Sequence, residues 1–209
     1  MSGLFITFEG IEGCGKTTQI KRLANRLDSL NHNITLTREP GGTDIGEAIR
    51  EIVKHPPEGA TISAHTELLL MNASRTQLIQ QIILPALKKG NTVLCDRFYD
   101  STLAYQGYGR QLDLNKVHKA IELAIENTKP NLTLLLDIPL EVSTKRVKER
   151  QLKTNETNDQ FDRSGELFFV DDRIDNCRVA SERGWIAHRF TNPQRLRDHL
   201  NSLGIRLKS

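Results

Sequence analysis

The sequence predicts an α/β fold with a mainly parallel sheet, because short strand-like segments alternate with amphipathic helical segments along the 209 residues. The strand-like segments are apolar and rich in β-branched residues, and they cover 4–9, 34–38, 92–96, 132–137 and 185–190. Between them, apolar residues recur at helical spacing. These helical faces comprise Ile20, Leu23, Ala24 and Leu27, then Leu114, Val117, Ile121, Ala124 and Ile125, and finally Val170, Ile174 and Cys177.

Length and composition favour one domain over residues 1–209. The formal net charge of +3 is too small to indicate a nucleic-acid partner. Cys14, Cys95 and Cys177 form no CxxC or Cys/His cluster, so we expect a reducing compartment rather than a disulfide framework. The sequence shows neither a secretory leader pattern at its N-terminus nor an apolar run of membrane-spanning length. We therefore expect a cytoplasmic protein with no membrane partner.

The strongest local motif is GIEGCGKT at residues 10–17, the phosphate loop, which fits GxxxxGK[ST] directly after a predicted strand and before a predicted helix. Glycines allow backbone N–H groups to point at phosphate oxygens, Lys16 supplies a mobile charge, and Thr17 supplies a hydroxyl for Mg²⁺. We interpret Cys14 as a compact spacer. The motif predicts binding of ATP and Mg²⁺, with ATP contacted by Gly10, Ile11, Glu12, Gly13, Cys14, Gly15, Lys16, Thr17 and Thr18.

Residues at the carboxyl ends of the predicted strands are the next candidates, because open parallel sheets bind ligands there. They are Glu9, Arg38, Asp96 and Asp137. Asp96 can position Mg²⁺, and Arg97 beside it can hold a second phosphate through its planar guanidinium. From these residues alone, a strand-end ion pair is an equal alternative.

Other classes of P-loop protein fit the sequence less well. A GTPase would carry an NKxD guanine-binding motif, whereas residues 115–118 read NKVH. A DNA-dependent ATPase would more often end a strand in paired acids, whereas Asp96 is followed by Arg97. Another small-substrate P-loop kinase and a nucleic-acid-regulated P-loop ATPase stay as alternatives.

Three blocks resemble the bacterial thymidylate kinases, along essentially the whole chain: FEGIEGCGKTT at 8–18, REPGGT at 38–43 and DRFYDSTLAYQG at 96–107. The resemblance implies a P-loop NTPase fold of three α/β/α layers, with a five-stranded parallel sheet in the order 2-3-1-4-5. It also implies transfer of the ATP γ-phosphoryl group to dTMP, with Mg²⁺ as cofactor, in a homodimer. Nucleic acid is not an expected partner of such an enzyme.

The resemblance assigns the contacts with dTMP to Arg38, Met71, Arg75, Arg97, Ser101, Tyr105 and Gln106. Arg97 would hold the acceptor phosphate and Arg75 would read the base. Met71, one helical turn before Arg75, stands where the family usually stacks a phenylalanine on the base. Without the resemblance, closure of a loop is the better interpretation of Tyr105 and Gln106.

The cation that neutralises the transferred phosphoryl group must come from outside the phosphate loop, which contains no arginine. The basic segment 145–150, KRVKER, leads into a polar stretch at 151–160 that we interpret as a mobile loop, and both resemble the bacterial lid, at about 146–165. Arg146 and Arg150 share a helix face, so we favour them over Lys148. Arg163 is a further candidate, and a solvated basic face is the alternative. The predicted catalytic residues are Lys16, Arg97, Arg146, Arg150 and, by the resemblance, Glu12.

Three regions have no single assignment. Glu39 has no predicted role, and a cis Glu39–Pro40 bond is an expectation from the tight turn and the resemblance. Residues 190–193 follow the last predicted strand and are candidates for adenine contacts. The apolar helical segment 68–87 can form either the homodimer interface or part of the core.

Overall fold

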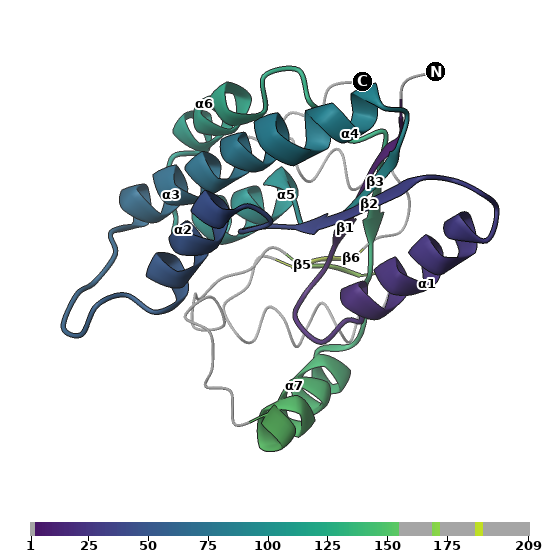
Figure 1. Cartoon of the computed structure of the whole chain (residues 1–209). Coiled ribbons are helices and arrows are strands. Elements are labelled where there is room, and N and C mark those ends of the chain that lie inside the picture. Colours follow the sequence, from purple (N-terminus) through teal and green to yellow (C-terminus); the bar gives the residue numbers. More distant parts are fainter. Residues whose placement is uncertain (1–2, 155–168, 172–186, 190–209) are drawn as a thin grey trace.

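Four parallel strands form the central sheet of the structure, a computed structural model that describes residues 3–154, 169–171 and 187–189. They are β1 (Phe5–Glu9), β2 (Ile34–Arg38), β3 (Thr92–Asp96) and β4 (Leu132–Leu135), and they lie in the order β2-β3-β1-β4 (Figure 1). The predicted strands at 34–38 and 92–96 are confirmed to the residue, and the order of these four strands is the predicted one.

The central position of β3 explains its continuous apolar run. β3 pairs with β1 along one edge and with β2 along the other, and its side chains are buried in core clusters on both faces of the sheet. Val93 and Cys95 belong to the larger core cluster, and Leu94 belongs to the smaller one, because successive side chains of a strand point to opposite faces. The register places Phe8 and Arg38 opposite Asp96, so the carboxyl ends of three strands meet at one edge.

Helices cover both faces of the sheet and complete three layers (Figure 1). On one face, α1 (Lys16–Asp28) packs through Ile20 and Ala24. The other face is covered by α3 (Ala64–Leu78), a π-helical segment (Ile79–Ile83), α4 (Leu84–Lys88) and α6 (Leu114–Ile125). Three further elements complete this side: α2 (Asp44–Lys54), which packs on α3, then α5 (Tyr99–Thr102) and a second π-helical segment (Leu103–Gly109).

The predicted apolar helix at 68–87 is continuous through α3, the first π-helical segment and α4. Leu68, Leu78, Ile79 and Ile83 are buried in the larger core cluster, which confirms the core interpretation for these residues. Leu69 on the same helix is 64% exposed, so part of the apolar surface stays outside the core.

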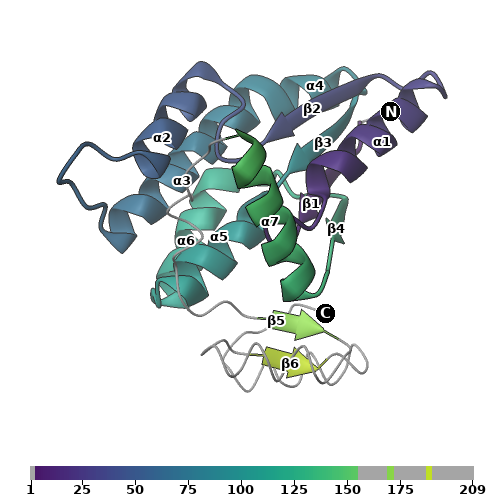
Figure 2. The ribbon, with the colours of Figure 1, turned by 90° about the horizontal axis from the view of Figure 1, so that it is seen from below.

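The C-terminal part differs from the prediction. The predicted mobile loop is wrong for residues 151–154, because α7 (Leu140–Thr154) continues through them; the first three of these residues, Gln, Leu and Lys, are good helix formers (Figure 2). The helix predicted around Val170 is wrong at 169–171, where an aromatic and a β-branched residue lie in β5 (Phe169–Asp171). The strand predicted at 185–190 contains β6 (Ala187–Arg189), which pairs in parallel with β5 in a separate two-stranded sheet. Arg163, Ile174, Cys177 and residues 155–160 and 190–193 lie outside the described residues.

Candidate active site

A pocket of about 810 Å³ opens at the carboxyl edge of the sheet. It joins the phosphate loop to the predicted acceptor residues, which lie far away in the sequence. The predicted site residues that line it are Glu12, Gly13, Cys14, Gly15, Lys16, Thr17, Thr18, Arg38, Met71, Asp96, Arg97, Ser101, Tyr105, Arg146 and Arg150. Those that do not line it are Gly10, Ile11, Arg75 and Gln106.

The phosphate loop turns at Gly10, Gly13 and Gly15, whose φ values of 136°, 73° and 98° are unfavourable for residues with a Cβ. α1 begins immediately after its N-cap residue, Gly15, which has no side chain that could accept a hydrogen bond from the start of the helix. The first backbone N–H groups of α1 are therefore available to an anion in the pocket.

Lys16 folds back over this loop. Its Nζ donates to the backbone oxygens of Gly10 at 2.8 Å and Ile11 at 3.1 Å. The side chain is buried, and this burial, together with the nearby Arg97 charge, lowers the pKa of Lys16 from its usual value. Cys14 packs within the loop at 5% exposure, as expected for a compact spacer.

Thr17 and Asp96, the two residues predicted to bind the metal, lie next to each other. The Thr17 hydroxyl donates to Asp96 Oδ2 at 3.1 Å, which brings the start of α1 to the end of β3. A hydroxyl and a carboxylate are oxygen ligands of the kind that Mg²⁺ prefers. Among the described residues, no group of three His, Cys, Asp or Glu side chains could hold a metal ion. The Thr17 hydroxyl and the Asp96 carboxylate fit Mg²⁺, which is usually bound by one or two carboxylates together with phosphate oxygens and water.

Arg97 also lines the pocket, and its backbone is in a constrained conformation. Its φ of 71° is in the left-handed region, which a non-glycine residue rarely adopts. Its Nη1 donates to the Ser101 hydroxyl at 3.1 Å, and its guanidinium lies 5.4 Å from the centre of the Tyr105 ring. Arg38 is more exposed and donates to both carboxylate oxygens of Glu47 at 2.8 and 2.9 Å. The guanidinium groups of Arg38 and Arg97 both belong to residues that line the pocket.

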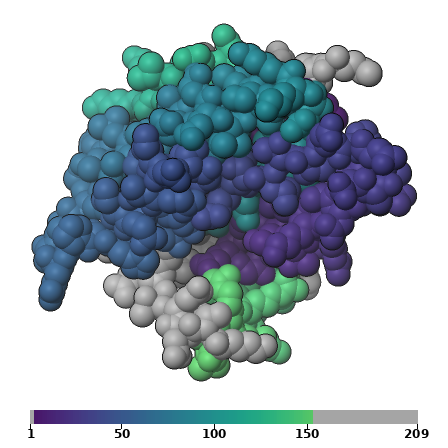
Figure 3. All heavy atoms as spheres, viewed as in Figure 1, coloured from purple at the N-terminus to yellow at the C-terminus, as the bar shows by residue number. Residues whose placement is uncertain are grey.

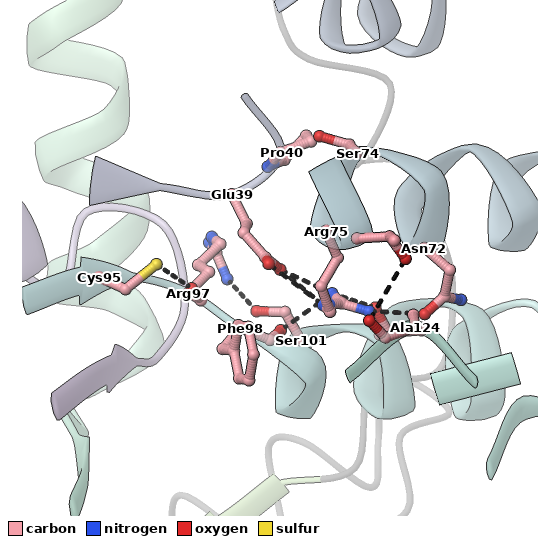
Figure 4. Close-up of polar contacts among 12 residues, drawn as sticks. Glu39, Pro40, Asn72, Ser74, Arg75, Cys95, Arg97, Phe98, Ser101 and Ala124 are labelled. Atoms are coloured by element: carbon pink, nitrogen blue, oxygen red, sulfur yellow. Dashed lines mark hydrogen bonds and ion pairs between the residues drawn. The ribbon is translucent and has the colours of Figure 1, made fainter. Parts of the chain in front are cut away.

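Arg75 is fully buried behind the pocket wall, while Glu39 lines the pocket. Arg75 Nε and Nη2 donate to Glu39 Oε2 at 2.9 and 2.7 Å (Figure 4). The guanidinium also donates to Asn72 Oδ1 at 2.9 Å, to Thr102 Oγ1 at 2.8 Å and to the backbone oxygen of Phe98 at 3.4 Å. Burial raises the pKa of Glu39, and the Arg75 charge acts in the opposite direction. The structure therefore finds a partner for Glu39, which had no predicted role, and confirms the cis Glu39–Pro40 bond.

Gln106 is also fully buried and faces a second carboxylate. Its Nε2 donates to Glu67 Oε1 at 2.7 Å, and Arg110 Nη2 donates to Glu67 Oε2 at 2.7 Å. The amide oxygen of Gln106 is buried and has no hydrogen-bond partner among the described residues. The contacts of Gln106 with dTMP stay a prediction, since its side chain lies outside the pocket lining.

Helix α7 docks on the phosphate loop. Its Ser143 hydroxyl donates to the backbone oxygen of Glu12 at 2.6 Å, and Arg146 Nη1 donates to the backbone oxygen of Gly13 at 3.2 Å. Arg150 forms an ion pair with the Glu12 carboxylate. In the space-filling view, α7 lies against the N-terminal segment (Figure 3). Arg146 and Arg150 both line the pocket and Lys148 does not, so the predicted shared face of the two arginines is confirmed.

Comparison with known proteins decides the family. A model of the thymidylate kinase family matches residues 8–171. The chain belongs to the thymidylate kinase family. A thymidylate kinase of Syntrophotalea carbinolica is 54% identical over 146 residues, which are 70% of this chain and 67% of that protein. A thymidylate kinase of Prochlorococcus marinus is 44% identical over 191 residues, covering 89% and 86% of the two chains.

A solved thymidylate kinase structure supports the same family assignment. The crystal structure of thymidylate kinase from Ehrlichia chaffeensis superimposes with a TM-score of 0.60 at 37% sequence identity, covering 74% of this chain and 88% of that chain. The predicted thymidylate kinase resemblance and the P-loop fold class are therefore confirmed. No helix in the described part of this thymidylate kinase family member is both long and apolar enough to cross a membrane.

Several pocket residues were missed from the sequence. Arg50 and Lys54 of α2 line the pocket, and Arg50 Nη1 donates to the backbone oxygen of Pro40 at 2.9 Å. Their spacing of four residues on the helix after REPGGT was a usable signal. The other lining residues that were not predicted are Gln19, Arg22, Glu39, Pro40 and Ile138.

Proposed function

We propose that ATP and dTMP occupy opposite ends of the pocket, with the transferred phosphoryl group between Lys16 and Arg97. As a member of the thymidylate kinase family, the chain phosphorylates dTMP to dTDP with ATP as co-substrate. The observation that supports this division is that the phosphate loop and the block from Asp96 to Tyr105 line one continuous space. Bringing two phosphorylated partners together in this way requires concentrated positive charge, which the pocket contains.

In this proposal the protein binds and orients the two nucleotides, and no side chain needs to abstract a proton from the attacking phosphate oxygen. The backbone N–H groups of the phosphate loop and Lys16 hold the donor phosphates, and Arg97 with Arg38 holds the acceptor phosphate. A phosphate monoester has a second pKa near 6, so the attacking oxygen is already largely ionised at neutral pH. Arg150 or Arg146 then balances the charge that spreads over the transferred group.

We further propose that Thr17 and Asp96 hold Mg²⁺ together with the ATP phosphates. The ion supplies additional charge neutralisation at the phosphate oxygens when it is bound. The neighbouring hydroxyl and carboxylate support this assignment. We also propose a cytoplasmic homodimer, which the family resemblance supports and which would give the exposed Leu69 of α3 an apolar partner surface.

A coupled assay of ADP release across nucleoside monophosphates tests the acceptor assignment. We expect kcat/KM for dTMP to exceed that for CMP or UMP by at least about 10²-fold, because a site built around specific polar contacts discriminates strongly. Comparable rates with UMP or CMP would remove dTMP as the preferred acceptor. ATPase activity stimulated by DNA or RNA, and not by any monophosphate, would instead favour a nucleic-acid-regulated ATPase.

Asp96→Asn tests the metal assignment. We expect the Mg²⁺ concentration for half-maximal activity to rise by about tenfold, because the amide keeps the shape and loses the charge that favours a hard cation. The measurement is a Mg²⁺ titration of initial rate at saturating nucleotides. Asp28→Asn, at the exposed end of α1, is the matched control and should leave the titration unchanged. An unaltered titration in Asp96→Asn would contradict the assignment.

A further inference from the structure

Glu9 is a buried carboxylate that lies behind the pocket at the end of β1, directly before the phosphate loop. It is 5% exposed and does not line the pocket. Its Oε1 accepts the backbone N–H of Phe98 at 2.7 Å, and its Oε2 accepts the Ser101 hydroxyl at 2.7 Å. The sequence marked Glu9 only as a strand-end residue, without a role.

These two hydrogen bonds restrain Arg97 at two points, its backbone and its guanidinium. Phe98 follows Arg97 in the chain, so Glu9 Oε1 restrains the backbone next to the left-handed turn at Arg97. Ser101 accepts from Arg97 Nη1 at 3.1 Å, so Glu9 Oε2 also restrains the guanidinium through the serine hydroxyl (Figure 4 shows the Arg97–Ser101 link). A left-handed conformation of a non-glycine residue persists only where its surroundings enforce it.

We propose that Glu9 is a positioning residue that orients Arg97 for the acceptor phosphate through Ser101. Because Gly10 follows Glu9, the same residue ties the start of the phosphate loop to the acceptor side of the pocket. The inference rests on the proposed role of Arg97, and Glu9 itself contacts neither nucleotide in it.

Protonation of Glu9 changes this chain of hydrogen bonds. The ionised carboxylate accepts from Ser101, which leaves the serine oxygen free to accept from Arg97. The acid protonated on Oε2 no longer accepts from the serine hydroxyl there, and it has lost the negative charge that attracts Arg97. Ionisation of Glu9 therefore favours the orientation of Arg97 that the proposal requires.

The titration of Glu9 falls in the neutral range. Burial raises its pKa to about 7, against the opposing effects of Arg97 and Ser101. The other ionisable groups that interact with it are Asp100 and Tyr99 of α5, Lys16 of α1 and Cys95 of β3. Since the ionised form predominates above this pKa, kcat/KM for dTMP should rise as the pH increases through about 7.

Glu9→Gln tests the proposal through the KM for each nucleotide and the pH dependence of kcat/KM, which together distinguish positioning of Arg97 from a purely structural role. We expect KM for dTMP to rise by about tenfold or more, as for loss of a hydrogen bond to a charged group, while KM for ATP changes less than about twofold. The step in kcat/KM for dTMP near pH 7 should disappear, leaving only the ionisation of dTMP itself near pH 6. Asp100→Asn is the matched control, because it removes a neighbouring carboxylate charge without breaking the chain of hydrogen bonds. It should keep the step but move it to lower pH, since the Asp100 charge raises the pKa of Glu9.

Unchanged KM for dTMP with a retained step in Glu9→Gln would overturn the proposal. If this variant does not fold, Ser101→Ala carries the test, since it keeps the carboxylate and removes its link to Arg97. A step near pH 7 that persists in Ser101→Ala would also overturn it. Failure of the underlying assignment is recognised separately: Arg97→Ala would then leave KM for dTMP unchanged.

Discussion

Replacing Glu39 with alanine is expected to lower the free energy of unfolding by about 3–5 kcal/mol, because it leaves the buried guanidinium of Arg75 without its counter-charge. Arg75 is completely buried and does not line the pocket, so its guanidinium stays shielded from bulk water even though Glu39 borders the pocket. Asn72 and Thr102 would still accept hydrogen bonds from Arg75, but both are neutral. The cost of the substitution therefore comes mainly from an uncompensated buried charge.

Thermal unfolding measures this effect directly. For a domain of this size, roughly 2–4 °C of Tm correspond to 1 kcal/mol, so we expect a decrease of about 6–20 °C. Glu51→Ala is the matched control, because Glu51 is exposed and forms a salt bridge with the exposed His55 four residues later on α2. That pair should contribute at most about 0.5 kcal/mol.

A double variant separates the lost charge balance from the lost side chain. Glu39→Leu with Arg75→Met removes both charges, and a well-packed apolar replacement of a buried ion pair is often neutral or stabilising. The double variant should therefore be more stable than Glu39→Ala. A Tm loss in Glu39→Ala no larger than in Glu51→Ala would show that the pair contributes little.

Replacing Arg150 with methionine is expected to reduce kcat by about 10³-fold, within the range attributed to a single arginine in phosphoryl transfer. The phosphate loop has no arginine of its own, and Arg150 reaches the pocket from α7. Its ion pair with Glu12 already places the guanidinium beside the phosphate loop. Because this charge acts mainly on the transition state, KM for ATP should change only a few-fold.

Steady-state kinetics with ATP and dTMP varied independently measures this effect. Arg146→Met should show a loss of the same kind, and comparison of the two variants assigns the larger share of the role. Lys148→Met is the matched control, because Lys148 is exposed on the same helix and does not line the pocket. Unchanged kcat in both arginine variants would remove the lid helix from catalysis.

The local signals in the sequence were sufficient for most of the fold. The strands at 34–38 and 92–96 were predicted to the residue because each is a short run rich in apolar and β-branched residues. The phosphate loop was recognised because its glycines, lysine and threonine must follow one another in a set order between a strand and a helix. Residues 151–154 were wrongly predicted as a loop and form the end of α7. A polar composition is typical of a solvated helix end as well as of a loop.

The sequence by itself determined the fold class, the phosphate loop and the family, because each depends on residues that are neighbours along the chain. Only the tertiary structure decided the partners of Glu9 and Glu39. Glu9 meets Ser101 and Glu39 meets Arg75 across 92 and 36 positions of the chain. Such pairing depends on which strand ends and helices the sheet order brings together, and a buried carboxylate looks the same in the sequence as an exposed one. The carboxylates that pair with Arg75 and restrain the backbone beside Arg97 were therefore visible only in the tertiary structure.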